Sequence, residues 1–257
     1  MQLLLLLLAF FLPPGAQAEE ILGGHEAKPH SRPYMAFLQY SVQGIPKICG
    51  GFLIREDFVL TAAHCWGSSL TVTLGAHNIR NQEKTQQVIR VRRAFHHPAY
   101  NSNDYSNDIM LLQLATRARL TAAVRPLKLP MNNVQVTPGK NCSVAGWGGT
   151  DLVGRGSDTL QEVMLTVLHD RTCQSLFNHN YHKAIEICVG DPKIKKCSFH
   201  GDSGGPLVCD NVAQGIVSHG YPNQTPPCVF TRISSFLPWI KKTMKMLQLR
   251  KAASPAL

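Results

Sequence analysis

One serine lies among glycines in the segment Gly201-Asp202-Ser203-Gly204-Gly205-Pro206. Because glycine lacks a Cβ, the backbone and a substrate can approach the Ser203 hydroxyl closely. The backbone N–H groups of Gly201 and Ser203 are expected to converge on an oxyanion and so stabilise the transition state of acyl transfer. A serine hydroxyl alone is a weak nucleophile and needs a base, which a third group must orient. The segment therefore predicts two further residues elsewhere in the chain.

His64 is the candidate for the base among the eleven histidines of the chain. It lies in Thr61-Ala62-Ala63-His64-Cys65, at the end of an apolar strand and beside a cysteine. A cross-link at that cysteine would hold the imidazole in place. Taken alone, His64 is equally typical of a buried structural histidine.

Asp108 is the candidate for the orienting group, because it follows a polar segment and opens the apolar run Ile109-Met110-Leu111-Leu112. An acid that leads into a core strand loses solvation unless a partner satisfies it. An imidazole N–H would do so and would fix the tautomer whose other nitrogen takes a proton. A lone acid there is also typical of a cap or a turn, but the three residues together favour a Ser-His-Asp triad.

The order of these residues separates two unrelated folds. Gly201-x-Ser203-x-Gly205 matches the nucleophile elbow of α/β-hydrolases, in which the serine precedes the acid and the histidine. Here His64 and Asp108 both precede Ser203, and the predicted strands do not alternate with helices. The order therefore excludes the hydrolase elbow.

The elements that must hold these residues are mainly strands. Helices are predicted at Asp170–Phe177 and Ser235–Leu249, the second with an apolar stripe at Phe236, Ile240, Met244 and Leu247. Short β-branched and aromatic runs separated by Gly, Pro and Asn clusters indicate an all-β sandwich or barrel. These runs are Phe52–Ile54, Phe58–Thr61, Leu70–Leu74, Gln87–Val91, Ile109–Leu114, Cys142–Ala145, Gln161–Val167, Pro206–Cys209, Ala213–Ser218 and Val229–Ile233.

The first 18 residues have the pattern of a secretory signal peptide, with an apolar run from Met1 to Leu12 and the small-residue site Ala16-Gln17-Ala18. A buried N-terminal helix is the alternative interpretation. No later segment approaches the roughly 20 apolar residues of a membrane span. We therefore expect a soluble, secreted protein without a membrane span.

Eight cysteines form an even set without a Cys-x-x-Cys pair, which in a secreted chain favours disulfides over a metal site. No metal or cofactor is predicted. Removal of residues 1–20, with their two glutamates, raises the formal net charge from +10 to +12. Such a charge favours polyanion partners such as sulfated glycans, and the sequence has no motif for specific nucleic-acid recognition. The candidate contacts are Arg90, Arg92, Arg93, Lys241, Lys242 and Lys245, for which a solvated charged face is the alternative.

Six motifs, in this order, resemble the chymotrypsin-like (S1) serine proteases over residues 21 to about 249: Ile21-Leu22-Gly23-Gly24, Thr61–Cys65, Asn107-Asp108-Ile109, Gly146-Trp147-Gly148, Gly201–Pro206 and Ser218-His219-Gly220. Three further segments resemble the granule branch of granzymes, cathepsin G and mast-cell chymase: His25–Met35, Thr73–Ile79 and Ile187–Asp191.

The resemblance implies two six-stranded antiparallel β-barrels, at about 21–120 and 121–249, with the active site between them, a C-terminal α-helix and a tail at 250–257. It assigns Ser203 as the nucleophile, His64 as the general base and Asp108 as its orienter. It places the oxyanion hole at the amides of Gly201 and Ser203. It also implies three disulfides, Cys49–Cys65, Cys142–Cys209 and Cys173–Cys188.

Activation is also implied by the resemblance. Glu19-Glu20 is similar to the short propeptide of granule proteases, which a dipeptidyl peptidase removes. The new Ile21 ammonium would then insert and pair with Asp202, since a buried carboxylate without a cation is costly. A plain turn residue is the alternative interpretation of Asp202.

Two cysteines align with the floor of the family's primary substrate pocket, Cys197 and Cys228, and neither carries a charge. The pocket is therefore predicted to be neutral, with cleavage after Phe, Tyr, Leu or Met rather than after Arg, Lys or Asp. A fourth disulfide between these cysteines requires Cα atoms within roughly 7 Å; two buried thiols are the alternative. The remaining predicted pocket residues are Ser198, His200, Ser218, His219 and Gly220.

The predicted function is that of a secreted granule serine endopeptidase in cytotoxic or inflammatory secretion. The alternative is a non-catalytic cationic protein, heparin-binding or antimicrobial, on the same fold. The resemblance also implies a monomer with serpin-type inhibitors and sulfated proteoglycans as partners. Sequons at Asn141 and Asn223 predict glycosylation.

Overall fold

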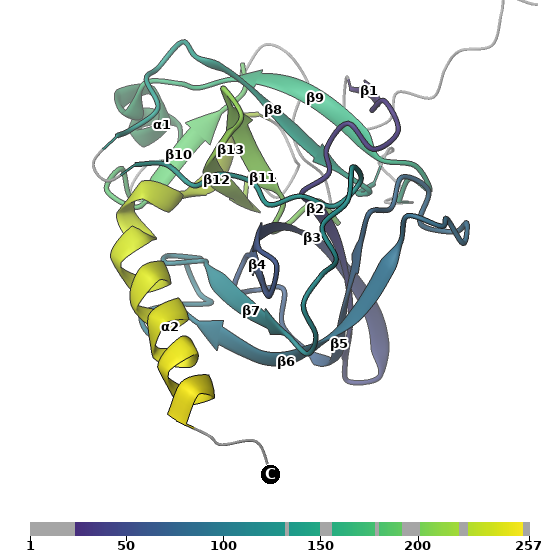
Figure 1. Cartoon of the computed structure of the whole chain (residues 1–257). Helices are drawn as coiled ribbons and strands as arrows, with labels where there is room; N and C mark the ends of the chain where they lie inside the picture. The colour runs from purple at the N-terminus through teal and green to yellow at the C-terminus, as the bar shows by residue number, and fades with distance from the viewer. Residues whose placement is uncertain are drawn as a thin grey trace, which may run out of the picture.

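The N-terminal half of the chain forms a closed barrel in the strand order β2-β3-β4-β7-β6-β5 (Figure 1). The computed structural model describes residues 24–131, 134–149, 156–177, 180–191, 201–220 and 226–253, the last six without side chains. A two-residue turn at Gln43 and Gly44, both with positive φ, joins the first two strands, as is typical of a tight hairpin. The barrel strands are β2 (Met35–Val42), β3 (Ile45–Arg55), β4 (Phe58–Thr61), β5 (Ser68–Leu74), β6 (Gln87–His96) and β7 (Met110–Leu114).

The C-terminal half forms a second antiparallel sheet in the order β1-β9-β8-β11-β12-β13-β10. An isolated bridge between Val167 and Val189 brings the end of β9 to β10, so that the six strands from this half curve back on themselves. The seventh strand, β1 (His25–Glu26), crosses over from the N-terminal segment and pairs with β9. The other strands are β8 (Asn141–Gly146), β9 (Gln161–Thr166), β10 (Glu186–Val189), β11 (Pro206–Cys209), β12 (Val212–His219) and β13 (Cys228–Arg232).

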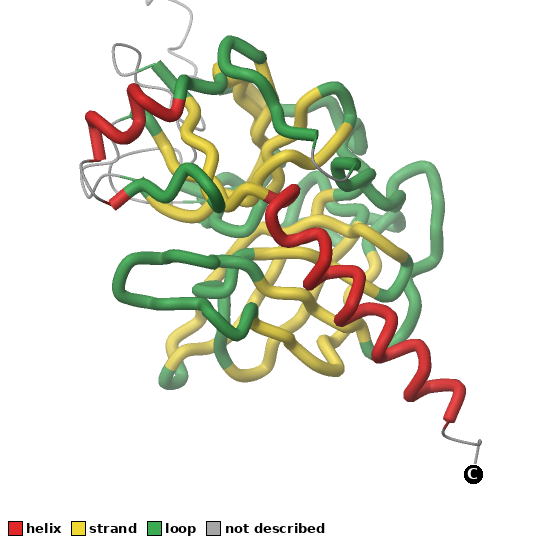
Figure 2. The backbone as a smooth tube through the Cα atoms, turned by 90° about the vertical axis from the view of Figure 1, so that its left-hand side faces the viewer, coloured by secondary structure: helices red, strands yellow, loops and turns green. Residues whose placement is uncertain are grey.

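Two helices complete the described fold, α1 (Asp170–Phe177) and α2 (Ile233–Ala253). The long helix α2 leaves the second sheet and runs down the N-terminal barrel (Figure 2). Its Phe236 and Trp239 rings meet the His97 ring of the barrel edge-on, at centroid distances of 5.1 and 5.3 Å. The helix therefore joins the two halves. Neither helix of the described residues is long and apolar enough to cross a membrane.

The predicted all-β class with a C-terminal helix is confirmed, and the predicted division near residue 120 falls between β7 and β8. Three strands were not predicted. Two of them, β1 and β10, are short. The third, β2, shows only a weak alternation of apolar and polar residues, because its Met35–Leu38 half is buried on both faces. Both faces of such a strand are covered by other elements, so its sequence does not alternate between apolar and polar residues.

The ends of strands from both halves meet where the candidate residues lie. His64 follows β4 and Asp108 precedes β7, whereas Ser203 precedes β11 and Ser218 lies in β12. The fold thus supplies the predicted base and its orienter from the barrel, and the predicted nucleophile from the second sheet.

Candidate active site

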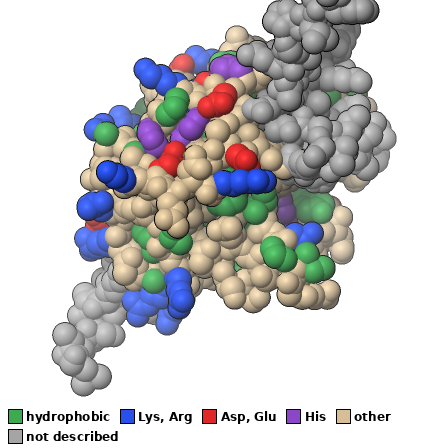
Figure 3. Space-filling view, turned by 90° about the vertical axis from the view of Figure 1, so that its right-hand side faces the viewer, with side chains coloured by type: hydrophobic (Ala, Val, Ile, Leu, Met, Phe, Trp, Pro, Cys, Tyr) green, Lys and Arg blue, Asp and Glu red, His purple; other side chains and the backbone are tan. Residues whose placement is uncertain are grey.

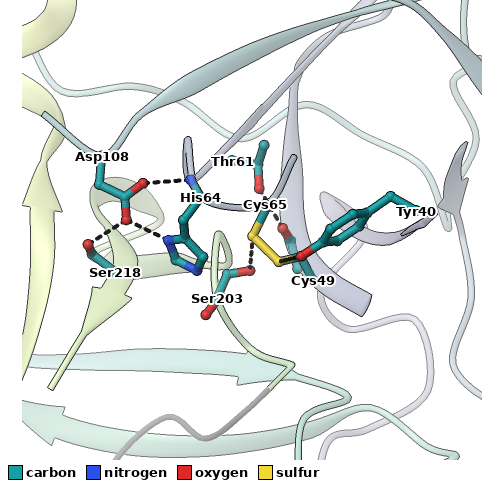
Figure 4. Close-up of a disulfide and its surroundings, with 9 residues drawn as sticks. Tyr40, Cys49, Thr61, His64, Cys65, Asp108, Ser203 and Ser218 are labelled. Carbon is teal, nitrogen blue, oxygen red and sulfur yellow. Dashed lines mark hydrogen bonds and ion pairs between the residues drawn. A yellow bond between two sulfur atoms is a disulfide. The ribbon is translucent and has the colours of Figure 1, made fainter. Parts of the chain in front are cut away.

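Asp108 is fully buried and binds His64 at two points. Its Oδ2 accepts a hydrogen bond from the His64 ring at Nδ1 (2.7 Å), and its Oδ1 accepts one from the His64 backbone N–H (3.0 Å). The Ser218 hydroxyl donates a further hydrogen bond to Oδ2 (2.6 Å), as Figure 4 shows. On the other side of the residue, Thr231 Oγ1 donates to the backbone carbonyl of Asp108 (2.7 Å). The carboxylate is therefore held by contacts from both halves.

These contacts keep Asp108 ionised. Burial alone would raise the pKa of its carboxyl, but the hydrogen bonds from His64 and Ser218 and the charge of His64 outweigh burial and lower that pKa. An ionised carboxylate only accepts hydrogen bonds, so His64 carries its proton on Nδ1. The Nε2 atom of the neutral ring is then free to accept a proton.

The Ser203 side chain lies beside the His64 ring, on the side away from Asp108 (Figure 4). The Gly50 N–H binds the Ser203 carbonyl (2.7 Å) and so ties the loop to the barrel. Gly204 has φ +85°, and a Cβ there would collide with Thr61 Oγ1 and the Gly50 carbonyl. Only glycine fits this approach, which accounts for one of the glycines of the motif.

The amides of Gly201 and Ser203 are the predicted oxyanion donors. Within the described part of the chain, neither of the two N–H groups donates a hydrogen bond, although the next two amides, of Gly204 and Gly205, do. Gly201 has φ +101°, a conformation that favours glycine. Donors without a hydrogen-bond partner among the described residues suit the stabilisation of a developing negative charge.

Three disulfides join pairs of described residues, and they are the pairs that the resemblance implies: Cys49–Cys65, Cys142–Cys209 and Cys173–Cys188. The first lies directly at the candidate site, where Cys65 Sγ contacts the Ser203 carbonyl at 3.5 Å. Cys49, His64 and Cys65 also form a compact cluster of metal-ligand types in the described residues. Both sulfur atoms are committed to the disulfide, so this cluster offers no thiolate to a metal.

Asp202 is fully buried beside the nucleophile loop. Its Oδ1 accepts a hydrogen bond from the Gly148 N–H (2.8 Å), and a Cβ on Gly146 or Gly148 would collide with the carboxylate. The Gly146-Trp147-Gly148 motif therefore lets the β8 backbone pack against this acid. Its predicted partner, Ile21, lies outside the described residues, as do residues 1–18 and Glu19-Glu20.

Tyr105 belongs to the site but was not predicted from the sequence. Its ring is edge-on to the His64 ring, with centroids 5.7 Å apart, and is stacked on the His219 ring at 5.4 Å. Its backbone is left-handed, with φ +57°, which is uncommon for a bulky residue. An aromatic side chain three residues before the candidate acid was the only sequence signal for it.

His219 is connected to Asp108 through Ser218. The Ser218 hydroxyl has one proton, which it donates to Asp108, so its 3.1 Å contact with His219 Nδ1 requires an N–H donor on that ring. Burial lowers the pKa of His219 to about 4, so the ring is neutral at higher pH. It therefore brings no positive charge for acidic substrate groups near neutral pH.

The described part of the predicted pocket consists of Ser218, His219, Gly220 and Cys228. The Cys228 side chain is buried and disulfide-bonded, and a Cβ on Gly220 would lie 3.7 Å from its sulfur. The other predicted pocket residues, Cys197, Ser198 and His200, lie outside the described residues, as does the sequon residue Asn223. Asn141 is exposed at the start of β8 and accepts a hydrogen bond from Thr166, whereas Ser143 of its sequon is buried.

Comparison with known proteins gives consistent matches over nearly the whole chain. Residues 21–240 match the family model described as trypsin. Human granzyme B is 65% identical over 245 residues, which cover 95% of this chain and 99% of that protein. Human granzyme H is 62% identical, with 96% and 100% covered, and human cathepsin G is 57% identical, with 97% of each covered. A solved structure described as "Structure of GrC" superposes with a TM-score of 0.84 at 58% identity, covering 87% of this chain and 99% of that one.

Proposed function

The chain belongs to the trypsin family of serine proteases, and from this premise we propose that Ser203 is its nucleophile, His64 its general base and Asp108 the residue that orients the base. The observation that carries the proposal is the buried Asp108 carboxylate, bound to His64 Nδ1 at 2.7 Å. This contact fixes the tautomer in which Nε2 takes a proton.

In the proposed reaction, Ser203 Oγ attacks the carbonyl carbon of the peptide bond while His64 Nε2 takes the hydroxyl proton. The amides of Gly201 and Ser203 donate hydrogen bonds to the carbonyl oxygen as it gains negative charge. His64 then gives its proton to the departing amine, which leaves an acyl-enzyme. A water molecule repeats the sequence, releases the acid and restores the Ser203 hydroxyl.

A fluorophosphonate probe tests the nucleophile. We expect it to label Ser203 of the processed protein and not the Ser203→Ala variant, and we expect the variant to lose about 10⁶-fold in kcat on peptides. Peptide mapping identifies the labelled residue. An unlabelled but folded wild-type protein would instead support the non-catalytic cationic protein.

We further propose that the substrate pocket is neutral and that the enzyme cuts after Phe, Tyr, Leu or Met. The proposal is supported by the buried, disulfide-bonded Cys228, which offers no charge to a substrate side chain. The Cys197–Cys228 pairing is part of this proposal. A library of peptides that differ only at the residue before the cut tests the preference, and a profile dominated by Asp or by Arg and Lys would contradict it.

For activation we propose that removal of Glu19-Glu20 frees the Ile21 ammonium to pair with Asp202. Support comes from the full burial of Asp202 and from strand β1, which leads the N-terminal segment onto the second sheet. A form that retains Glu19-Glu20 is expected to be inactive on peptides and to gain activity after dipeptidyl peptidase treatment. Equal activity of both forms would contradict this.

We propose that the protein is secreted, is stored in the granules of haematopoietic cells as a monomer and meets serpin-type inhibitors and sulfated proteoglycans. The family and the positive charge support this, as do the exposed Lys242 and Lys245 on α2. On the face shown in Figure 3, basic side chains are spread out rather than gathered in one patch. Earlier elution of a Lys242→Glu/Lys245→Glu variant from heparin would support a contact at α2.

A further inference from the structure

A hollow of about 960 Å³ lies at one end of the N-terminal barrel, and none of its lining residues belongs to the candidate triad. Its walls are the β2–β3 turn, the segment from Trp66 into β5, and the middle of β6. The residues that matter here are Val42, Trp66, Leu70, Arg90, Arg92 and Arg93, and this set is called the arginine groove below.

A β-bulge gathers the three arginines. The pairing of β6 with β7 shifts between Val91 and Arg93, which makes Arg92 the extra residue. In an unbroken strand, Arg93 would point to the same face as the buried Ile89. The extra residue of the bulge reverses the alternation of side chains between the two faces beyond it, so that Arg90, Arg92 and Arg93 are all exposed.

Within the described residues, none of these three guanidinium groups forms an ion pair or a hydrogen bond with an acidic side chain. Other arginines of the chain do pair with acids: Arg32, Arg55, Arg80, Arg117 and Arg232. Guanidinium groups match carboxylates in charge and in planar geometry. Three adjacent cations without a counter-charge in the described part of the chain are therefore complementary to an anionic ligand.

The groove begins next to the candidate active site. Trp66 directly follows Cys65, whose sulfur contacts the Ser203 carbonyl, and its side chain is 49% exposed. A Cβ on Gly67 would collide with the Ser41 carbonyl, so glycine lets this segment pass close to β2. The Trp66 end of the groove is thus one residue from the Cys65 sulfur that contacts Ser203, and we expect an extended polypeptide flank on this side of Ser203 to run toward the groove.

We propose that the arginine groove binds an acidic segment of the polypeptide that is cleaved at Ser203. The inference rests on the proposed function, because it assigns the ligand to the substrate chain. Charge complementarity selects the acidic residues. The apolar surfaces of Val42, Leu70 and Trp66 suit the side chains that flank them, and for this reason we favour a polypeptide over a sulfated glycan.

The test compares two fluorogenic peptides with the same residues around the cut. One carries a tail of six Glu and Asp residues, and the other a tail of six Gln and Asn residues, each placed on either side of the cut. The variant is Arg90→Glu/Arg92→Glu/Arg93→Glu. The control, Lys28→Glu/Lys128→Glu/Arg171→Glu, has the same change in net charge, and its three side chains are exposed elsewhere on the chain.

We expect an acidic tail on one side to raise kcat/KM of the wild type about tenfold at low salt, and less as the salt concentration rises. The groove variant should lose this advantage, whereas the control variant keeps it and both cleave the neutral-tailed peptide like the wild type. Equal loss in both variants, or no effect of the acidic tail, would overturn the proposal.

A binding measurement separates this proposal from the proposed function. Fluorescence anisotropy of the labelled acidic peptide with the Ser203→Ala variant reports the groove even if no peptide is cleaved. If binding of the acidic peptide disappears when the three arginines are replaced, the proposal is supported. Arginine-dependent binding of a heparin oligosaccharide without any binding of the acidic peptide would assign the groove to a glycan and overturn the proposal.

Discussion

Two carboxylates lie buried on either side of β13, and they behave in opposite ways. Asp108 is 0% and Glu186 is 3% exposed, yet the pKa of Asp108 lies below its usual value while burial raises the pKa of Glu186 to about 7. The difference lies in their hydrogen-bond donors. Asp108 receives three on its carboxylate, whereas Glu186 receives the His182 N–H on Oε2 (2.7 Å), and its buried Oε1 has no hydrogen-bond partner among the described residues.

A nearby cation does not offset the effect of burial on the pKa of Glu186. The Arg232 guanidinium lies beside it but donates to the Glu186 backbone carbonyl (2.7 Å), and the nearby Tyr181 hydroxyl donates to Asp170 Oδ1 (2.6 Å). Burial alone therefore does not decide the charge of an acid in this fold. The donors aimed at the carboxylate and the charges beside it decide it together with burial.

The first test of the comparison replaces each of the two acids by its amide. Asp108→Asn presents an amide that can donate to His64 Nδ1, which leaves the proton on Nε2 and blocks transfer from Ser203. We expect kcat on a peptide substrate to fall about 10⁴-fold. Glu186→Gln, the matched change, should leave kcat within about twofold. A fall of less than tenfold for Asp108→Asn would contradict the assigned role.

The second test concerns stability and pH. In the folded state Glu186 holds its proton up to about pH 7, whereas an unfolded glutamate loses it near pH 4.5. The folded state therefore binds more protons in this range, and the stabilisation present below pH 4.5 is lost as the pH rises through 7. Relative to Glu186→Gln, the wild type should lose on the order of 3 kcal/mol between pH 4.5 and pH 8.

Urea unfolding at pH 5 and pH 8, with the disulfides intact, measures this difference. Glu56→Gln, which removes a surface glutamate of the barrel, controls for the loss of one charge. If the wild type and Glu186→Gln change in parallel with pH, the raised pKa of Glu186 is wrong.

The contrast between the two acids also marks how far the sequence predicts the site. His64, Asp108 and Ser203 each carry a local signal: a strand end beside a cysteine, an acid before an apolar run, and a glycine-rich loop. Thr231, which binds the Asp108 carbonyl, is 123 residues distant in the chain, and no local pattern indicates it. Glu186 likewise opens a short strand whose burial depends on β13 and Arg232.

The fold shows the same limit. The bounds of α1 and β11 follow from caps and apolar runs alone, and both are as predicted. The pairing of β1 with β9 joins residues more than 130 positions apart, so only the folded chain reveals it. Tyr105 is a site residue because a left-handed turn directs its ring to His64 and His219.

A third test removes one donor from the better-satisfied acid. Ser218→Ala takes away the 2.6 Å hydrogen bond to Asp108 Oδ2 and so makes Asp108 more like Glu186, with fewer donors on its carboxylate. We expect kcat to fall about tenfold, because a hydrogen bond to a charged group contributes roughly 1.5–3 kcal/mol, part of which water can replace. An unchanged kcat would show that the remaining two donors suffice.

The smallest expected effect concerns His219, which acts on Asp108 only through Ser218. His219→Phe keeps a ring to stack on Tyr105 but removes the Nδ1–H that binds Ser218 Oγ. A neutral hydrogen bond contributes about 1 kcal/mol, so kcat should fall about fivefold. His219→Asn places an amide N–H near the position of Nδ1 and should restore kcat to within about twofold, although it has no ring. If His219→Phe retains activity and His219→Asn does not, His219 contributes by stacking on Tyr105 and not by its hydrogen bond. Ser218 then keeps its orientation without the hydrogen bond from His219.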